Sequence, residues 1–474
     1  MQETILSLVQ KANGILADYI LIILLVGTGL WFTIKTRFVQ VRCFKEGMKA
    51  VFGNFSLRGG RQEGGLSSFQ ALATAIAAQV GTGNIVGASG AILIGGPGAI
   101  FWMWIIAFLG MATIYAEATL AQETRIIDKD GEVHGGPVYY MKKAFPNGFG
   151  TFLSVFFAIA TTLALGFMGS MVQSNSIAES CNTAFGIEGW IVGLIIAVIA
   201  AFIFLGGIQR IASVTEKMVP FMAGIFLLGG LIVLIIRITY IPETIGMIFR
   251  YAFTPNALIA GGIGYALKTA ISQGAKRGLF SNEAGMGSTP HAHAMAKVAK
   301  PHDQGVVAMI GVFIDTFVVL TMTALVVISC LYAGDGVLNA SLVSPEAYSA
   351  ATSGVEALVS KTNAMQMAVT SAFPESFGNF GNIFVAVCLL FFAYSTIIGW
   401  NFFGKINVQY LTKNSKAATV IYSVIAIAFI FMGSLLSNDL VWELTDFFNY
   451  LMVLPNVIAL IALWKIVAKN ANNK

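Results

Sequence analysis

The sequence reads Gln79-Val80-Gly81-Thr82-Gly83-Asn84-Ile85-Val86-Gly87-Ala88-Ser89-Gly90 in the middle of an apolar run that is too long for an element of a globular core. Glycine recurs there every few residues, which predicts a membrane helix that is interrupted. An interruption at bilayer depth frees backbone carbonyls and amides where no water can satisfy them, and chains keep that arrangement where the freed groups bind an ion or a solute. Transport is therefore the first hypothesis for this chain.

The composition is that of a polytopic membrane protein. Of the 474 residues, 57% are hydrophobic and 11% are charged, against roughly 25% charged residues in soluble domains. The net charge of +5 comes from basic residues between the spans, so the lipid bilayer is the expected partner and nucleic acid is not. Residues 1–16 lack the pattern of a removable signal peptide. The four cysteines are scattered without CxxC spacing and are expected to be free thiols.

The apolar runs predict an all-α protein with about eleven transmembrane helices, since a span needs roughly 20 apolar residues. The predicted spans lie near residues 16–36, 68–95, 98–123, 150–173, 189–206, 217–238, 258–280, 304–332, 380–403, 416–436 and 443–467. Lys and Arg gather in alternate connections and in the C-terminal tail. By the positive-inside rule these segments are cytoplasmic, which predicts an inner-membrane protein with its N-terminus outside and its C-terminus in the cytoplasm.

An internal repeat links the second and seventh spans. Ala71-Leu72-Ala73-Thr74-Ala75-Ile76 recurs as Ala266-Leu267-Lys268-Thr269-Ala270-Ile271, and each copy is followed by a glutamine and then by a glycine-rich interruption, Gly81–Gly90 or Gly274–Gly287. In the predicted orientation the two copies run in opposite directions, as in the inverted repeats of transporters.

The repeat predicts three parts of the chain. They are an extra N-terminal helix with its cytoplasmic connection (1–66), a first five-helix repeat (67–240), and a second, inverted five-helix repeat with a cytoplasmic tail (241–474).

The first interruption carries ligand chemistry. Gly81 and Gly83 permit backbone angles that β-branched residues resist, while Thr82 and Asn84 supply a hydroxyl and a carboxamide oxygen, which suit an alkali cation. The helix that restarts afterwards presents free amides and a positive dipole end, which favour a carboxylate. An amino acid bound beside a sodium ion satisfies both the oxygen ligands and the free amides. The alternative is that the glycines only allow close helix packing. A nucleotide site is set aside because no strand precedes Gly81.

The second interruption is expected in Gln273–Ser288. Thr269, Ser272 and Gln273 precede it at helical spacing and are candidates to contact the substrate, while Asn282 and Glu283 are candidates to hold the broken ends together. Lys276 and Arg277 are interpreted as ordinary cytoplasmic anchors.

Ionisable residues deep in a span are costly and usually functional. Asp315 is the clearest case, and three roles stay open for it: a cation ligand, a proton carrier, or a partner of Lys268. Glu117 and Asp446 lie nearer the ends of their spans, where solvated carboxylates are expected.

The adjacent hydroxyls of Ser395 and Thr396 either complete a cation site or bond the carbonyls of their own helix. The histidines raise the alternative of a metal-dependent enzyme, because His291, His293 and His302 lie in one short stretch. They lack the i, i+4 helical spacing of a zinc hydrolase, so no metal site is expected at these histidines. Sodium is the only metal ion that we expect this protein to bind. No pairing of nucleophile and base indicates an enzyme.

Two segments resemble those of a known family, the alanine/glycine:cation symporters of bacteria and archaea. They are Gly81-Thr82-Gly83-Asn84-Ile85-Val86-Gly87 and Gly278-Leu279-Phe280-Ser281-Asn282-Glu283-Ala284-Gly285-Met286-Gly287-Ser288. The eleven-span layout extends the resemblance over nearly the whole chain. The family is similar in fold to the sodium-coupled leucine transporter, with the broken first helix of each five-helix repeat at the centre.

The resemblance implies two cation positions. One uses the carbonyls of Ala77 and Val80 with two hydroxyls; a second ion, if present, uses the Gln79 carbonyl, Asn84 and Asp315. The expected cation-binding residues are Ala77, Val80, Asn84, Asp315, Ser395 and Thr396.

The resemblance also implies a pocket for a small side chain between Gly166, Phe167 and Trp400. The expected substrate-binding residues are Gln79, Gly81, Thr82, Gly83, Gly166, Phe167, Thr269, Ser272, Gln273 and Trp400. The predicted function is sodium-coupled symport of alanine or glycine into the cell, without catalytic residues and with sodium as co-substrate in place of a cofactor. Proton coupling and, less favoured, a channel are the alternatives. The sequence assigns no oligomeric state.

Overall fold

The computed structural model describes residues 2–53, 66–129, 131–204, 207–253, 263–339 and 359–472. These residues are almost entirely helical, as the sequence predicts. Among them, eight helices are long and apolar enough to cross a membrane, and a helix pair bent by 48° adds a ninth. The shorter apolar helix α11 (Gly189–Phe204) and the 20-residue, less apolar helix α14 (Ile263–Asn282) lie at the two remaining predicted span positions.

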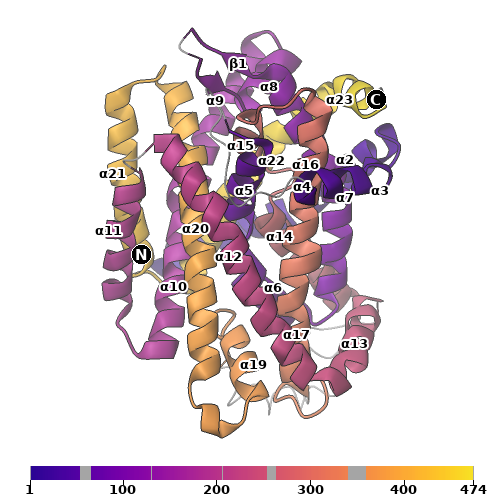
Figure 1. Cartoon of the computed structure of the whole chain (residues 1–474), viewed down its shortest axis with the longest axis vertical. Helices are drawn as coiled ribbons and strands as arrows, with labels where there is room; N and C mark the ends of the chain where they lie inside the picture. The colour runs from indigo at the N-terminus through magenta and orange to yellow at the C-terminus, as the bar shows by residue number, and fades with distance from the viewer. Residues whose placement is uncertain are drawn as a thin grey trace.

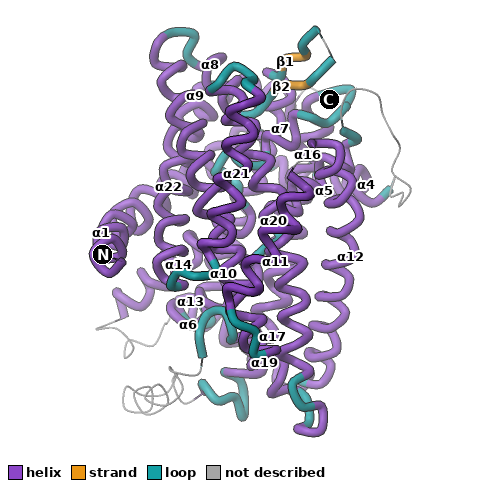
Figure 2. The backbone as a smooth tube through the Cα atoms, turned by 90° about the vertical axis from the view of Figure 1, so that its left-hand side faces the viewer, coloured by secondary structure: helices purple, strands orange, loops and turns teal. Residues whose placement is uncertain are grey.

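The spanning elements follow the predicted order. They are α1 (Gln2–Ile15) with η1 (Leu16–Leu21) and α2 (Ile22–Lys35), α5 (Ser68–Gln79) with η2 (Gly83–Gly87) and α6 (Ala88–Gly95), α7 (Ala99–Thr124), α9 (Gly148–Thr161) with η3 (Thr162–Gly169) and α10 (Ser170–Phe185), α11, α12 (Gly207–Ile236), α14, α16 (Pro301–Val312) with η5 (Phe313–Leu320) and α17 (Thr321–Leu331), α20 (Phe380–Leu411), α21 (Lys416–Gly433) and α22 (Asn438–Ala462). α1 lies at the side of the bundle (Figure 2).

The connections separate to the two ends of the bundle (Figure 1). At one end lie the antiparallel strands β1 (Ile126–Ile127) and β2 (Val133–His134), together with α8 (Pro137–Ala144) and α23 (Trp464–Asn472). At the other end lie α13 (Ile241–Phe253) and α19 (Ala364–Ala372). The remaining short elements are α3 (Val39–Arg42), α4 (Phe44–Phe52), η4 (Ile238–Tyr240), α15 (Pro290–Ala294) and η7 (Glu375–Phe377).

Apolar and polar side chains are arranged for a bilayer. Large apolar residues on the outer helices stand exposed, for example Phe202 (69%), Leu228 (65%) and Val424 (61%). Carboxylates such as Glu117 and Asp315 are instead fully buried between the helices. In lipid the apolar surface needs no cover, whereas polar groups must find partners inside the protein.

Several spanning helices contain a π-helical segment, and these segments carry residues singled out in the sequence. η2 holds Asn84, η3 holds Gly166 and Phe167, and η5 holds Asp315. A π-turn shifts the register of one helix face and is frequent at functional sites.

The second interruption needs a correction. α14 runs without a break from Ile263 to Asn282, so Gly274 and Gly278 lie inside a helix. The chain leaves the helix only at Glu283, which has φ +59°, followed by Gly285 at +93° and Gly287 at +81°. The expectation of a break beginning at Gly274 is therefore wrong: glycine inside a helix is tolerated when a neighbour packs closely, as Trp102 does against Gly274.

Candidate functional site

The first interruption has the expected form. α5 begins with a capping box, in which Ser67 Oγ accepts from the Gln70 amide (3.0 Å) and Gln70 Oε1 accepts from the Ser67 amide (3.1 Å). The helix ends at Gln79, and Val80, with φ −79° and ψ 89°, turns the chain before η2 begins at Gly83. This bend frees backbone groups inside the bundle.

Two hydroxyls from α20 reach the carbonyls at this bend. Thr396 Oγ1 lies 3.0 Å from the Ala77 carbonyl oxygen and 3.5 Å from that of Val80, and Ser395 Oγ lies 3.2 Å from the Ala77 oxygen. Each hydroxyl also bonds the Phe392 carbonyl of its own helix. The bonds to the carbonyls of their own helix are therefore present, and four oxygens from segments more than 300 residues apart converge at the bend. A cation among these oxygens stays a prediction.

Close packing at this point requires glycine. A Cβ at Gly81 would lie 2.2 Å from Thr396 Oγ1, and one at Gly399 would lie 3.0 Å from Ala78 Cβ. The close packing that the sequence offered as one interpretation is therefore present, because the missing side chain of Gly81 lets the Thr396 hydroxyl approach the bend.

Asp315 lies beside the same bend, fully buried. Its carboxylate accepts from Asn84 Nδ2 (2.6 Å), Ser281 Oγ (2.9 Å) and Thr316 Oγ1 (2.9 Å). The oxygen of Asn84, expected to face a cation, accepts from the Gly81 amide (2.9 Å). η2, η5 and the end of α14 therefore meet at one carboxylate.

Lys268 does not neutralise this carboxylate. Its ammonium lies 3.4 Å from Asp18 Oδ2 and 3.2 Å from Tyr19 Oη. The pairing of Lys268 with Asp315 is therefore excluded, because the lysine is engaged with η1.

The two interruptions are joined directly. Gln79 Nε2 donates to the carbonyl of Asn282, the last residue of α14, over 2.6 Å. Asn282 Oδ1 accepts from the Ala284 amide (3.0 Å), and Glu283 accepts from Trp400 Nε1 (2.5 Å) and from Ser288. Asn282 and Glu283 thus hold the ends of the second interruption, as the sequence suggested.

Glu117 of α7 organises the turn after α14. Its two oxygens accept from the amides of Gly285 (3.1 Å) and Gly287 (2.9 Å), and Oε1 also accepts from Asn456 Nδ2 (2.6 Å). The prediction of a solvated Glu117 is wrong: the side chain is fully buried and replaces the backbone partners that the turn gives up.

A polar cavity of about 250 Å³ is lined by residues of α1, η2, α6, α14 and α22 and by Lys361, which precedes α19. Arg277 crosses it to Asp446, with Nη2 3.0 Å from Oδ2, and its guanidinium stands 4.7 Å from the ring centroid of Trp442. Lys361 bonds Asp439 at 3.0 Å on the same wall. The expectations of a cytoplasmic anchor at Arg277 and a solvated Asp446 are wrong, because the two side chains, 11% and 4% exposed, form a salt bridge inside the bundle.

Three predicted substrate residues lie along α14, away from its end at Asn282. Ser272 donates to Asp18 (2.6 Å), and Gln273 lines the polar cavity. Lys276, expected as an anchor, bonds the same Asp18 at 3.1 Å. Nine or more helical residues separate Gln273 and Thr269 from Asn282, a distance of at least about 13 Å along the axis. Their contact with a substrate stays a prediction.

Gly166, Phe167 and Trp400 each pack on another residue, and the expected pocket between them stays a prediction. Gly166 packs on Tyr422 of α21, and Phe167 stacks on Phe429 with ring centroids 4.9 Å apart. Trp400 instead stands over Gly169 and beside Phe280. Trp400 thus contacts η3 at Gly169, three residues after Gly166.

Gln173 of α10 is a residue that sequence reasoning missed. Its Oε1 accepts from the Thr82 amide (3.2 Å). Within the described residues, Gln173 Nε2, Thr82 Oγ1 and Gln79 Oε1 are buried atoms without a hydrogen-bond partner. Buried polar groups rarely stay unpaired, so this group is the best candidate contact for a polar solute. The available signal was a glutamine at the end of the predicted span 150–173, directly before Ser174-Asn175-Ser176.

The chain is similar to known proteins over nearly its whole length. The family model described as "Sodium:alanine symporter family" matches residues 2–473. The chain is 39% identical to the sodium/alanine symporter AgcS of Methanococcus maripaludis over 96% of its own length and 94% of that protein. It is 37% identical to the amino-acid carrier protein AlsT of Bacillus subtilis, over 99% and 92%.

A solved structure shares the fold. The manganese transporter of Eremococcus coleocola superposes with a TM-score of 0.52 at 14% identity, over 87% of this chain and 81% of that one. The full-length family match and the level of identity to its relatives leave one assignment: this chain belongs to the sodium:alanine symporter family, a family of transporters and not of enzymes.

Proposed function

We propose that this protein is a secondary active transporter that carries alanine or glycine into the cell together with sodium, by alternating access. One observation carries the proposal: the hydroxyls of Ser395 and Thr396 converge on the carbonyls of Ala77 and Val80 at the bend of a broken helix. An all-oxygen set of carbonyls and hydroxyls suits an alkali cation. Sodium is then a co-substrate, and no cofactor takes part.

The substrate site is proposed beside this cation. The freed amides of η2 favour the carboxylate of an amino acid, and the unpaired atoms of Thr82, Gln79 and Gln173 supply further polar contacts. The space is narrow, because a Cβ at Gly83 would lie 3.0 Å from Ser281 Cα and 3.1 Å from Phe280 Cδ1. Little room for a side chain favours alanine and glycine over larger amino acids.

Proton coupling through Asp315 is the rival that a specific observation favours. This carboxylate is buried among Asn84, Ser281 and Thr316, all neutral partners. Sodium-dependent uptake that persists in Asp315→Asn excludes an obligatory proton role. Proton coupling is supported if Asp315→Asn abolishes uptake and if low external pH drives uptake by the wild-type protein in the absence of sodium.

We further propose an inner-membrane location with the C-terminus in the cytoplasm and the N-terminus outside. The basic connections predicted to be cytoplasmic include β1, β2, α8 and the tail, which share one end of the bundle (Figure 1). The division at residues 67–240 and 241–474 stays a prediction.

Uptake of labelled L-alanine by proteoliposomes tests the proposal. An inward sodium gradient is expected to drive saturable, uphill accumulation, and Ser395→Ala and Thr396→Val are expected to raise the sodium concentration for half-maximal uptake. Ser423→Ala is the matched control, because its hydroxyl bonds only the Thr419 carbonyl of its own helix (2.9 Å). Absence of sodium-dependent uphill uptake overturns the proposal, and non-saturating downhill flux indicates a channel.

A further inference from the structure

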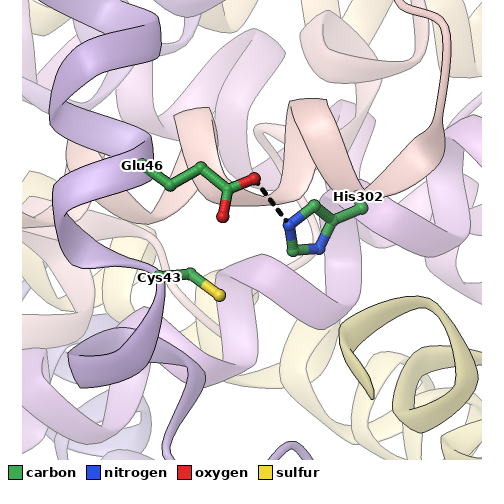
Figure 3. Close-up of side chains that lie close together, drawn as sticks. All are labelled: Cys43, Glu46 and His302. Atoms are coloured by element: carbon green, nitrogen blue, oxygen red, sulfur yellow. Dashed lines mark hydrogen bonds and ion pairs between the residues drawn. The ribbon is translucent and has the colours of Figure 1, made fainter. Parts of the chain in front are cut away.

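A cluster of metal-ligating side chains lies outside the transport site, where α4 meets the start of α16. Cys43 Sγ, a Glu46 carboxylate oxygen and one ring nitrogen of His302 lie within 4.8 Å of one another. Figure 3 shows Cys43 and Glu46 on one side and the His302 ring opposite, with Glu46 Oε1 3.1 Å from His302 Nε2. We propose that these three residues bind a thiophilic divalent cation of the Zn²⁺ class, which ties the connection before α5 to α16.

The donor set selects the class of ion. A thiolate, an imidazole and a carboxylate are the ligands that Zn²⁺ takes in proteins, with a water in the fourth tetrahedral position. Sodium, magnesium and calcium prefer all-oxygen sites. Ligand atoms on a tetrahedral Zn²⁺ stand about 3.5 Å apart, so the side chains need to move inward by about 1 Å from positions within 4.8 Å.

The backbone holds the ligands in place. Cys43 is the N-cap of α4 and Glu46 lies in its first turn, three residues on, which places both side chains on one helix face. His302 is the second residue of α16, after Pro301. The two helices touch one turn away, because a Cβ at Gly47 would lie 2.7 Å from Ile310 Cγ1 and 2.8 Å from the Val306 carbonyl oxygen.

Tyr115 of α7 contacts the His302 ring at Nδ1, the nitrogen that does not face Glu46. Its Oη lies 2.7 Å from His302 Nδ1. With an ion on Nε2, Nδ1 carries the proton and donates to Tyr115 Oη. Metal-bound histidines regularly donate their second ring N–H to such a partner, which fixes the tautomer and the ring orientation.

The cluster also has a route of entry. The Glu46 side chain is 40% exposed, whereas that of His302 is 8% exposed and Cys43 is buried. An ion therefore meets the carboxylate first and loses water as it reaches the imidazole and the thiolate.

This site departs from the expectation of no metal beyond sodium, which rested on the spacing of the histidines. The three histidines of that stretch separate in the fold. His291 bonds Asn407 (2.9 Å) and His293 bonds Gln304 (2.8 Å), both in the protein interior. His302 instead meets two residues that precede it by more than 250 positions.

Cobalt spectroscopy on the purified full-length protein tests the proposal. Titration with Co²⁺ is expected to give one equivalent with tetrahedral visible bands and a thiolate-to-cobalt charge-transfer band, both removed by excess Zn²⁺. Cys43→Ser is expected to abolish the charge-transfer band. Tyr115→Phe is expected to weaken binding by about 10- to 100-fold.

Two variants serve as matched controls. Cys388→Ser removes a buried thiol on α20, and His134→Asn removes the histidine of the other carboxylate cluster, which holds Asp128 and Glu132. Both are expected to keep the charge-transfer band. A band that persists in Cys43→Ser, or one that Cys388→Ser abolishes, overturns the proposal.

The wild-type titration keeps the proposal testable if a variant does not fold. Absence of a charge-transfer band in the wild-type protein overturns the site without any substitution. Zn²⁺ is also expected to raise the thermal unfolding midpoint, and Glu46→Gln, at a partly exposed position, is expected to reduce that rise. None of these readouts measures transport, so their result is independent of the proposed function.

Discussion

The side-chain amide of Gln79 donates a 2.6 Å hydrogen bond to the main-chain carbonyl of Asn282, which joins the ends of α5 and α14. Both residues are the last of their helices, and both are buried. A carbonyl at a helix end has no partner within its own helix. A side chain at the end of α5 therefore satisfies the free carbonyl at the end of α14.

Gln79→Leu is expected to uncouple the two interruptions. The substitution keeps the approximate volume but leaves the Asn282 carbonyl unpaired in a buried site, which costs about 1–3 kcal/mol. A lower thermal unfolding midpoint and slower alanine uptake are the expected results. Unchanged values of both would show that the hydrogen bond does not hold the helices together.

Gly81→Ala is expected to weaken cation binding. The new methyl group would stand 2.2 Å from Thr396 Oγ1, so the hydroxyl must leave the carbonyls of the bend. The sodium dependence of uptake measures the effect, with a higher half-saturating concentration as the expected outcome. Gly27→Ala is the control, since a Cβ there meets nothing within 4 Å; equal behaviour of the two variants would contradict the site.

Glu117→Gln is expected to loosen the turn after α14. The carboxylate accepts three hydrogen bonds, whereas a carboxamide turns an NH₂ group toward at least one of these donors. Bonds to charged groups contribute about 1.5–3 kcal/mol each, so a clear fall of the unfolding midpoint is expected. Glu123→Gln, at an exposed position of the same helix, is the control and should leave the midpoint unchanged.

Arg277→Ala and Asp446→Ala are each expected to destabilise the protein strongly, because each leaves its partner buried and unpaired. Breaking one side of a buried pair costs about 3–5 kcal/mol. The double variant is expected to be less destabilised than the sum of the two single variants. A double-mutant cycle on the unfolding free energy measures this coupling, and strict additivity would argue against a direct pair.

Local patterns were enough to predict the spans and the first interruption. Apolar runs of about 20 residues are a property of neighbouring positions, and the glycines around Thr82 lie within one turn of each other. The second interruption was placed too early, because glycine density alone does not distinguish Gly274, which packs inside α14, from Gly285, which needs a positive φ.

The polar residues inside the bundle were likewise predictable only in part. The hydroxyl pair of Ser395 and Thr396 was recognisable because two adjacent polar residues stand out in an apolar helix. The predicted exposure of Glu117 and Asp446 is wrong, since it rested on their position near the ends of their spans. Each carboxylate is instead covered by a partner far away in the sequence: Glu117 by the turn after α14 and Asp446 by Arg277.

The sequence by itself determined that this chain is a bundle of membrane helices with a glycine-broken helix near its centre and, through its family match, that it belongs to the sodium:alanine symporters. Only the tertiary structure decided which groups meet: Gln79 with Asn282, Thr396 with Ala77, Glu117 with Gly285 and Cys43 with His302. The physical reason is that hydropathy and backbone propensity act over a few residues. Hydrogen bonds between distant segments depend instead on how whole helices pack.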